Sequence, residues 1–180
     1  MSVLQRTLRL AVPLLLVLAA CGGGGGSSGP TAPPPPAPGI VFTPSSAGAS
    51  GITLTAATAP NTSTLLLEVR ANSVTDLYGV AFDLTYPATQ LQFVRATAGP
   101  LLNNGAVQAV ASTPGTLVVG GTHLGATPGA NGSGVVLTLE FNAVAAGSGS
   151  FAFARNSALN STGATISGMT WLAGSVTVTK

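Results

Sequence analysis

The sequence predicts an all-β sandwich or barrel, and three observations lead to this fold class. Apolar residues recur at every second position in several runs, as they do in strands that bury one face and wet the other. Turn signals rich in Gly, Pro and Asn separate these runs at short intervals, which is typical of β-sandwiches and barrels. No window of about a dozen residues carries the apolar stripe of a helix.

The alternation and the turn signals together predict nine strands. They cover residues 52–57, 63–71, 78–86, 91–97, 106–112, 116–122, 134–144, 149–155 and 172–179. Alternation is clear in the third of these, because Val80, Phe82 and Leu84 occupy one phase and small or polar residues the other. Pro87 suits the first position of a turn, so a brief helical turn is expected over 87–91.

The first twenty residues predict a secretory signal. Arg6 and Arg9 precede the apolar run 10–18, which is too short to span a bilayer because a spanning helix needs about 20 residues. Small residues then come directly before Cys21, the only cysteine, in the order Leu-Ala-Ala-Cys. This resembles a bacterial lipoprotein lipobox. The resemblance implies cleavage before Cys21, acylation of its sulfur and new N-terminus, and residence in the cell envelope.

Removing the signal changes the charge balance. The whole chain has six basic and four acidic residues, and loss of Arg6 and Arg9 leaves four against four, a net charge of zero. A neutral domain without a basic stripe lacks the electrostatic footprint that nucleic acid requires. With Cys21 acylated, no disulfide can form, so the core alone must hold the fold.

Between the signal and the domain the sequence predicts a tether. Residues 21–39 combine the lipidated cysteine with a Gly/Ser run and the prolines 33–36, a composition that behaves as coil followed by extended polyproline. Residues 40–180 remain as one domain, of a length that can bury a sizeable core. If the cell is Gram-negative, Gly22 directly after the cysteine favours the outer membrane.

Within the domain an ordered set of segments resembles a cohesin domain over about residues 50–179. The segments are LYGVAFDLTYP at 77–87, LQFV at 91–94, GPLL at 99–102, GTLVVGGT at 115–122, GSGVVLTLEF at 132–141 and AAG at 145–147. The resemblance implies a nine-stranded sandwich with jelly-roll topology, akin to carbohydrate-binding modules. In cellulosome scaffoldins, cohesins bind dockerins, the calcium-binding modules carried by polysaccharide-degrading enzymes.

The resemblance therefore implies a non-enzymatic surface receptor for a dockerin-type protein, acting in polysaccharide breakdown or surface assembly. It would need no cofactor of its own, since calcium would belong to the dockerin. The candidate contact residues lie along 78–86 and 116–122. They are Tyr78, Gly79, Ala81, Asp83, Thr85, Val119 and Gly121.

Two departures from scaffoldin cohesins concern this face. Gly79 and Ala81 stand where those cohesins often show Asn and Asp to the dockerin, and Tyr86-Pro87 lacks the intervening Asp of their usual Tyr-Asp-Pro. The polar contacts of ordinary dockerin recognition are thus missing, although a different partner could use the same face.

Two other functions stay open at the level of sequence. In a carbohydrate-binding module, Trp171 would stack on a sugar and would have to be exposed and coplanar with Tyr78. If the strand is regular, the side chain of Trp171 points to the opposite side from that of Val176, which would expose it. A bulge at Gly174 would turn the Trp171 side chain inward instead. We expect a packed tryptophan, because large aromatic side chains are mostly buried in domains of this size. The third function is a structural envelope lipoprotein.

No catalytic or metal site is predicted. His123 is the only histidine and no free thiol accompanies it, so it is expected to be a loop or rim residue. The carboxylates at 68, 76, 83 and 140 are scattered, and those at 68, 83 and 140 lie on polar strand phases. They therefore suggest neither a ligand cluster nor the carboxyl pair of a glycosidase.

Overall fold

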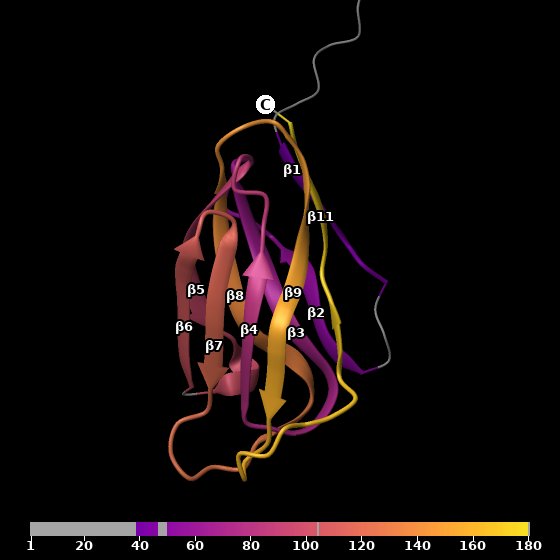
Figure 1. Cartoon of the computed structure of the whole chain (residues 1–180), viewed down its shortest axis with the longest axis vertical. Coiled ribbons are helices and arrows are strands. Elements are labelled where there is room, and N and C mark those ends of the chain that lie inside the picture. Colours follow the sequence, from indigo (N-terminus) through magenta and orange to yellow (C-terminus); the bar gives the residue numbers. More distant parts are fainter. Residues whose placement is uncertain (1–38, 47–49, 104, 180) are drawn as a thin grey trace, which may run out of the picture. The chain divides into compact units, whose positions relative to one another are not determined.

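The computed structural model describes residues 39–46, 50–103 and 105–179, and these form two β-sheets packed face to face (Figure 1). The all-β fold predicted from period-two patterning and the sandwich implied by the cohesin resemblance are both confirmed. The expected signal peptide, Cys21 and nearly all of the expected tether lie outside the described residues. No helix in the described part of the chain is long and apolar enough to cross a membrane.

One sheet has six strands in the order β1-β11-β9-β4-β7-β6, and the other has five in the order β10-β2-β3-β8-β5. The six-stranded sheet contains β1 (Gly39–Pro44), β11 (Gly174–Thr179), β9 (Gly147–Leu159), β4 (Gly79–Thr85), β7 (Thr116–Thr122) and β6 (Ala106–Thr113). The five-stranded sheet contains β10 (Thr170–Leu172), β2 (Gly51–Ala57), β3 (Thr64–Leu77), β8 (Ala130–Ala143) and β5 (Leu91–Ala98).

Strand β4 shows why these residues form a half-buried strand. Val80, Phe82 and Leu84 are buried, whereas Ala81 and Thr85 on the opposite phase are exposed. Each apolar side chain of this phase points into the space between the sheets, because successive strand residues face opposite sides. β4 lies between β9 and β7, and both pairings are antiparallel.

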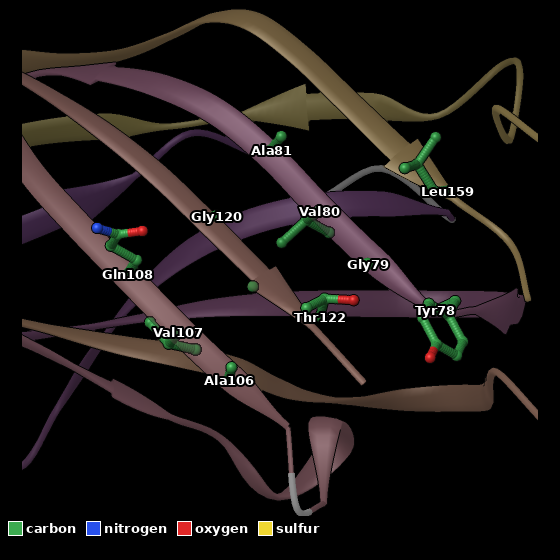
Figure 2. Close-up of a pocket in the computed structure, with 11 residues that line it drawn as sticks. Tyr78, Gly79, Val80, Ala81, Ala106, Val107, Gln108, Gly120, Thr122 and Leu159 are labelled. Atoms are coloured by element: carbon green, nitrogen blue, oxygen red, sulfur yellow. The ribbon is translucent and has the colours of Figure 1, made fainter. Parts of the chain in front are cut away.

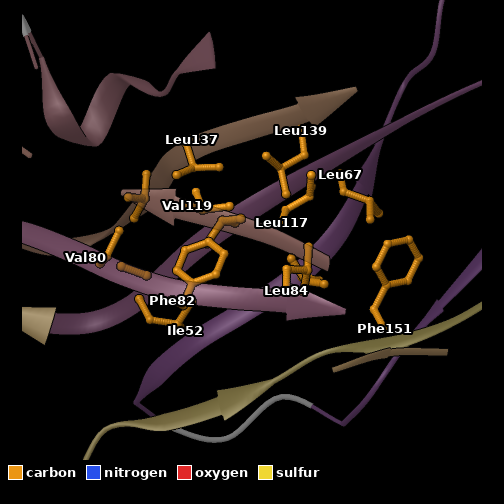
Figure 3. Packing of buried hydrophobic residues seen from close by; sticks show 14 of the residues in the cluster. Ile52, Leu67, Val80, Phe82, Leu84, Leu117, Val119, Leu137, Leu139 and Phe151 are labelled. Atoms are coloured by element: carbon orange, nitrogen blue, oxygen red, sulfur yellow. The ribbon is translucent and has the colours of Figure 1, made fainter. Parts of the chain in front are cut away.

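The core lies between the two sheets and is built from branched aliphatic and phenylalanine side chains (Figure 3). Phe141 of β8 contacts Phe93, Tyr86 and Phe151, with ring centroids 5.2–5.7 Å apart. Full burial of a Leu or Phe side chain contributes about 1.5–3 kcal/mol. The described residues contain no cysteine, so this packing rather than a cross-link stabilises them.

The described residues hold eleven strands rather than nine. β1 was expected to be tether and the start of the domain, yet it pairs with β11 over Gly39–Pro44, and Phe42 packs edge-on against Phe151 at 5.8 Å. The predicted strand 172–179 corresponds to β11, and only its first residue, Leu172, belongs to β10, which pairs in parallel with β2 in the other sheet. Both extra strands depend on partners far along the chain, which local patterning does not reveal.

Two short turns complete the fold. The carbonyl of Pro87 accepts hydrogen bonds from the N–H groups of Gln90 (3.0 Å) and Leu91 (2.9 Å), so one helical turn follows the proline as expected. A 3-10 helix over Pro100–Leu102, which was not predicted, buries Leu102 against the end of the sandwich.

Candidate partner-binding face

The two predicted contact strands, β4 and β7, are neighbours in the six-stranded sheet, and one side of this sheet faces away from the core. We call the outward residues of β9, β4, β7 and β6 the outer face. Cross-strand pairing arranges them in four rows. The rows are Ala106–Thr122–Gly79–Leu159, Gln108–Gly120–Ala81–Ser157, Val110–Val118–Asp83–Ala154 and Thr116–Thr85–Ala152.

A groove of about 550 Å³ follows the first two rows (Figure 2). Its floor is shallow in side chains, since Gly79, Gly120 and Ala81 contribute at most a methyl group. Figure 2 shows Tyr78 and Leu159 at one end and Gln108 at the other. A second hollow of about 320 Å³ shares Ala81, Gln108 and Gly120 with it and extends toward Val110 and Val118.

The structure places most of the predicted contact residues on this face. Gly79, Ala81, Asp83 and Thr85 occupy the outward phase of β4, and Tyr78 lies at the end of the groove. Their role in binding stays a prediction.

The prediction was wrong about which phase of β7 faces outward. Val119 is 1% exposed and belongs to the core, and the missing side chain of Gly121 would point toward Leu102 and Leu137. The outward residues are Val118, which is 43% exposed, and Gly120. The run Leu117-Val118-Val119-Gly120-Gly121 has apolar or side-chain-free residues on both phases, so alternation could not distinguish them.

Asp83 carries the only carboxylate of the outer face, and Arg155 neutralises it. The Arg155 guanidinium donates to the Asp83 carboxylate; the Arg155 side chain is 76% exposed and that of Asp83 is 11% exposed. An irregularity between Ala81 and Asp83 in the β4–β9 pairing inserts an extra residue in β9, where Arg155 has a φ of 45°. Such a bulge redirects a side chain, and here it accompanies the ion pair.

Tyr78 is fixed by the loop that follows β7. Its hydroxyl donates to the carbonyl of Gly125, its carbonyl accepts the N–H of His123 at 2.8 Å, and the two rings lie 5.6 Å apart. The Nε2 of His123 is buried without a hydrogen-bond partner. His123 thus lies in a loop, as expected, and supports the end of the groove.

Trp171 belongs to a different cluster. It is half-buried in β10, and its ring contacts Phe82 at 5.7 Å and Phe153 at 5.3 Å. Tyr78 contacts His123 instead, so the rings of Tyr78 and Trp171 do not share one stacking platform. Trp171 lies in β10 and Val176 in β11. Because the two residues belong to different strands, the alternation that places Val176 does not decide where the Trp171 indole points.

The remaining carboxylates have structural partners. Glu68 pairs with Arg70 at 2.8 Å and Glu140 with Arg95 at 2.7 Å. In the part of the chain that the structure describes, no three His, Cys, Asp or Glu side chains lie close enough together to hold a metal ion.

Asp76 links two loops at the Tyr78 end of the sandwich. Its carboxylate accepts the hydroxyl of Ser161 at 2.8 Å and the N–H of Gly129 at 2.9 Å. The Ser161 hydroxyl bond, aided by bonds from the backbone N–H groups of Gly129 and Ser161, outweighs desolvation and lowers the pKa of Asp76. Asp76 therefore holds together the loop that contains Gly129 and the loop that contains Ser161.

Comparison with known proteins agrees with this geometry. The family model described as "Cohesin domain" matches residues 50–178. No curated protein sequence matches the chain. Similar solved structures include the second type II cohesin module of the adaptor scaffoldin ScaA from Acetivibrio cellulolyticus. It has a TM-score of 0.60 and 19% identity, and the match covers 72% of this chain and 91% of that one.

Two further structures widen the comparison. A cohesin in a type II cohesin-X-dockerin complex from Acetivibrio cellulolyticus has a TM-score of 0.58 and 20% identity, covering 68% of this chain and 94% of that one. A non-cellulosomal cohesin from the archaeon Archaeoglobus fulgidus has a TM-score of 0.53 and 16% identity, covering 74% of this chain and 87% of that one. At these identities the likeness concerns the fold.

Proposed function

The chain belongs to the cohesin domain family, whose members are non-catalytic protein-binding modules, and from this premise we propose that it docks a dockerin-type partner at the cell surface. The observation that carries the proposal is the outer face. It combines a groove, exposed Val110 and Val118, and only one ion pair, on strands within the matched residues 50–178. Exposed apolar residues that adjoin a groove support an interaction site on this face.

The choice of partner is supported by what similar structures contain. Two of them are complexes in which a cohesin is bound to a dockerin, and in one of these the sixth cohesin of scaffoldin B from Acetivibrio cellulolyticus binds a mutant of the Cel5 dockerin. On this chain Gly79 and Ala81 present no polar side chain. We therefore expect recognition to depend on apolar contact and shape, with few direct hydrogen bonds from β4.

We further propose that Cys21 carries the lipid that anchors the chain. The proposal rests on Arg6 and Arg9, the short apolar run after them, and Ala19-Ala20 before the cysteine. The Gly/Ser and Pro segment after Cys21 would then give the domain reach from the membrane surface. Envelope location follows from this anchor and is proposed with it.

Docking is tested with every dockerin module encoded in the genome that encodes this chain. The protein is the chain from residue 21 onward with Cys21→Ser, which prevents acylation, and binding is measured by calorimetry with and without EDTA. We expect at least one module to bind in a calcium-dependent way, because dockerins carry calcium. Binding by none of them would contradict the proposal.

The binding face is tested with Val118→Glu, which adds a charge beside Asp83 in the third row of the outer face. We expect strong loss of affinity, because burying an unpaired charge costs several kcal/mol. The matched control is Thr177→Glu on β11, an exposed outward position of the same sheet away from the outer face. Equal losses in both variants would argue against this face.

The anchor is tested in cells with Cys21→Ala. We expect the wild-type chain in the membrane fraction, with a mass that includes acyl groups on a peptide beginning at Cys21, and the variant without them. A wild-type mass without acylation would contradict the anchor and leave the docking proposal untouched.

A further inference from the structure

One of the small residues that keep the groove open lies at the centre of the outer face. Gly120 lies in β7 between Ala81 of β4 and Gln108 of β6. A Cβ atom built at Gly120 would meet no atom within 4 Å. The backbone pairing on both sides is regular there, so the hollow is open space above an intact sheet.

Gly120 is not required by the backbone. The glycines with φ values that side chains rarely adopt include Gly115 and Gly125 on either side, but Gly120 is not among them. A larger residue would therefore fit the strand without strain, and would gain from lower chain entropy in the unfolded state. The backbone conformation therefore does not require glycine at this position.

The chemistry of the groove restricts what can occupy it. Among its lining residues only Tyr78 has an ionisable side chain, and the hydroxyl of Tyr78 is engaged by the carbonyl of Gly125. The nearby charges on Asp83 and Arg155 cancel each other. Charge complementarity therefore favours an uncharged occupant. A volume of about 550 Å³ falls within the range of about 300–1,000 Å³ that holds drug-sized groups, so it admits a large side chain.

We infer that the groove is a socket for one bulky apolar side chain, aromatic or branched aliphatic, of the dockerin-type partner, and that Gly120 sets the size accepted. The inference rests on the proposed function and specifies its chemistry. Interface energy concentrates in a few large side chains that fill central pockets, and the Gly120 site lies in the central rows of the outer face. A side chain placed on residue 120 would occupy the socket from within.

The test uses the series Gly120→Ala, Gly120→Val and Gly120→Leu in the chain from residue 21 onward with Cys21→Ser. We expect affinity for the bound dockerin module to fall progressively, by at least about 30-fold for leucine, as for loss of a hot-spot contact. The melting temperature should stay equal or rise along the series. A merely structural role would lower both together. The control Ser175→Leu adds the same side chain on β11 outside the groove.

A second measurement does not depend on the dockerin. Indole and 4-methylphenol, the side-chain groups of Trp and Tyr, are titrated into the ¹⁵N-labelled protein, with acetate as the charged control. We expect amide shifts confined to the groove, at Gly79, Ala81, Gly120 and Thr122, and none with acetate. Gly120→Leu should abolish them.

The outcomes separate the two proposals. Dockerin binding that Gly120→Leu leaves unchanged would overturn the socket and keep the docking function. Absence of any dockerin binding would overturn the docking function. The amide shifts with indole would then show whether the groove still accepts a bulky apolar group. Shifts outside the groove, or equal shifts in the leucine variant, would overturn it.

Discussion

Two neighbouring glycines in β7, Gly120 and Gly121, show how the two sides of the six-stranded sheet differ. A Cβ atom on Gly121 would lie 3.2 Å from Leu102 Cδ1 and 3.5 Å from a methyl group of Leu137, because this side faces the filled core. A Cβ atom on Gly120 would meet nothing within 4 Å on the outer face. The same residue type thus serves close packing on one side and an open groove on the other. The structural role of a small residue therefore depends on which side of the sheet it faces.

The largest effect is expected where the inward side is emptied. Phe82→Ala in β4 removes a ring that contacts Phe153 and Trp171, and should lower the free energy of unfolding by about 3–5 kcal/mol. Ala81→Ser, its outward neighbour, should change it by less than about 0.5 kcal/mol. Urea denaturation measures both, and similar losses would abolish the distinction between the two sides.

Overfilling the inward side should cost less than emptying it. Gly121→Val should destabilise the domain by about 1–3 kcal/mol, since Leu102 and Leu137 must shift to admit the new side chain. Gly120→Val should be neutral or stabilising by about 0.5 kcal/mol. The two variants differ by one position and not in composition, so the difference between their urea midpoints measures the difference between the two environments directly. A stability loss at Gly120 would show that the outer face is packed.

Removing a surface cation should have a smaller effect on stability. Arg155→Ala leaves the Asp83 carboxylate unpaired on the outer face, and should cost about 1 kcal/mol or less because the arginine is largely exposed. The matched control is Arg95→Ala, which breaks the Arg95–Glu140 pair on the other sheet. Both should lower stability slightly in urea, but only Arg155→Ala should weaken binding of a partner. If both variants weakened binding equally, the partner would not be docking specifically on the outer face.

The smallest effect should depend on pH and disappear in acid. The lowered pKa of Asp76 means that the folded state favours its charged form, so its contribution to stability is present above the unfolded pKa of about 3.9. That contribution is lost as the pH falls through the folded pKa. Asp76→Asn should therefore melt below the wild type at pH 7, with a gap that narrows toward pH 2. A constant gap would mean that shape, and not charge, holds the two loops.

The fold was predictable because its central strands follow one simple period. Residues 78–86 alternate cleanly, and the structure buries Val80, Phe82 and Leu84 as that alternation requires. β1 and β10 were not predicted, since each is short and becomes a strand only through pairing with β11 or β2. Local pattern identifies strands that bury a face and misses those that complete an edge.

The candidate site was predictable only in part, for a related reason. The β4 side of the outer face followed from alternation, but β7 did not, because Val118 and Val119 are equally apolar and glycine has no side chain to indicate a phase. The emptiness above Gly120 depends on Ala81 and Gln108, which reach it only through sheet pairing. A groove made by absent side chains leaves no motif in the sequence.

The pairing of β1 with β11 has a mechanical consequence. Gly39 lies opposite Thr179, and the six residue pairs of this ladder run from there to Pro44 opposite Gly174. If the chain is anchored ahead of residue 39, as proposed, a pull on the domain enters at Gly39 and runs along the strand. A pull directed along β1 would load the hydrogen bonds of the ladder together, in shear, and would not peel them apart one after another. A domain attached in this way would resist such a pull with all six residue pairs of its first strand together.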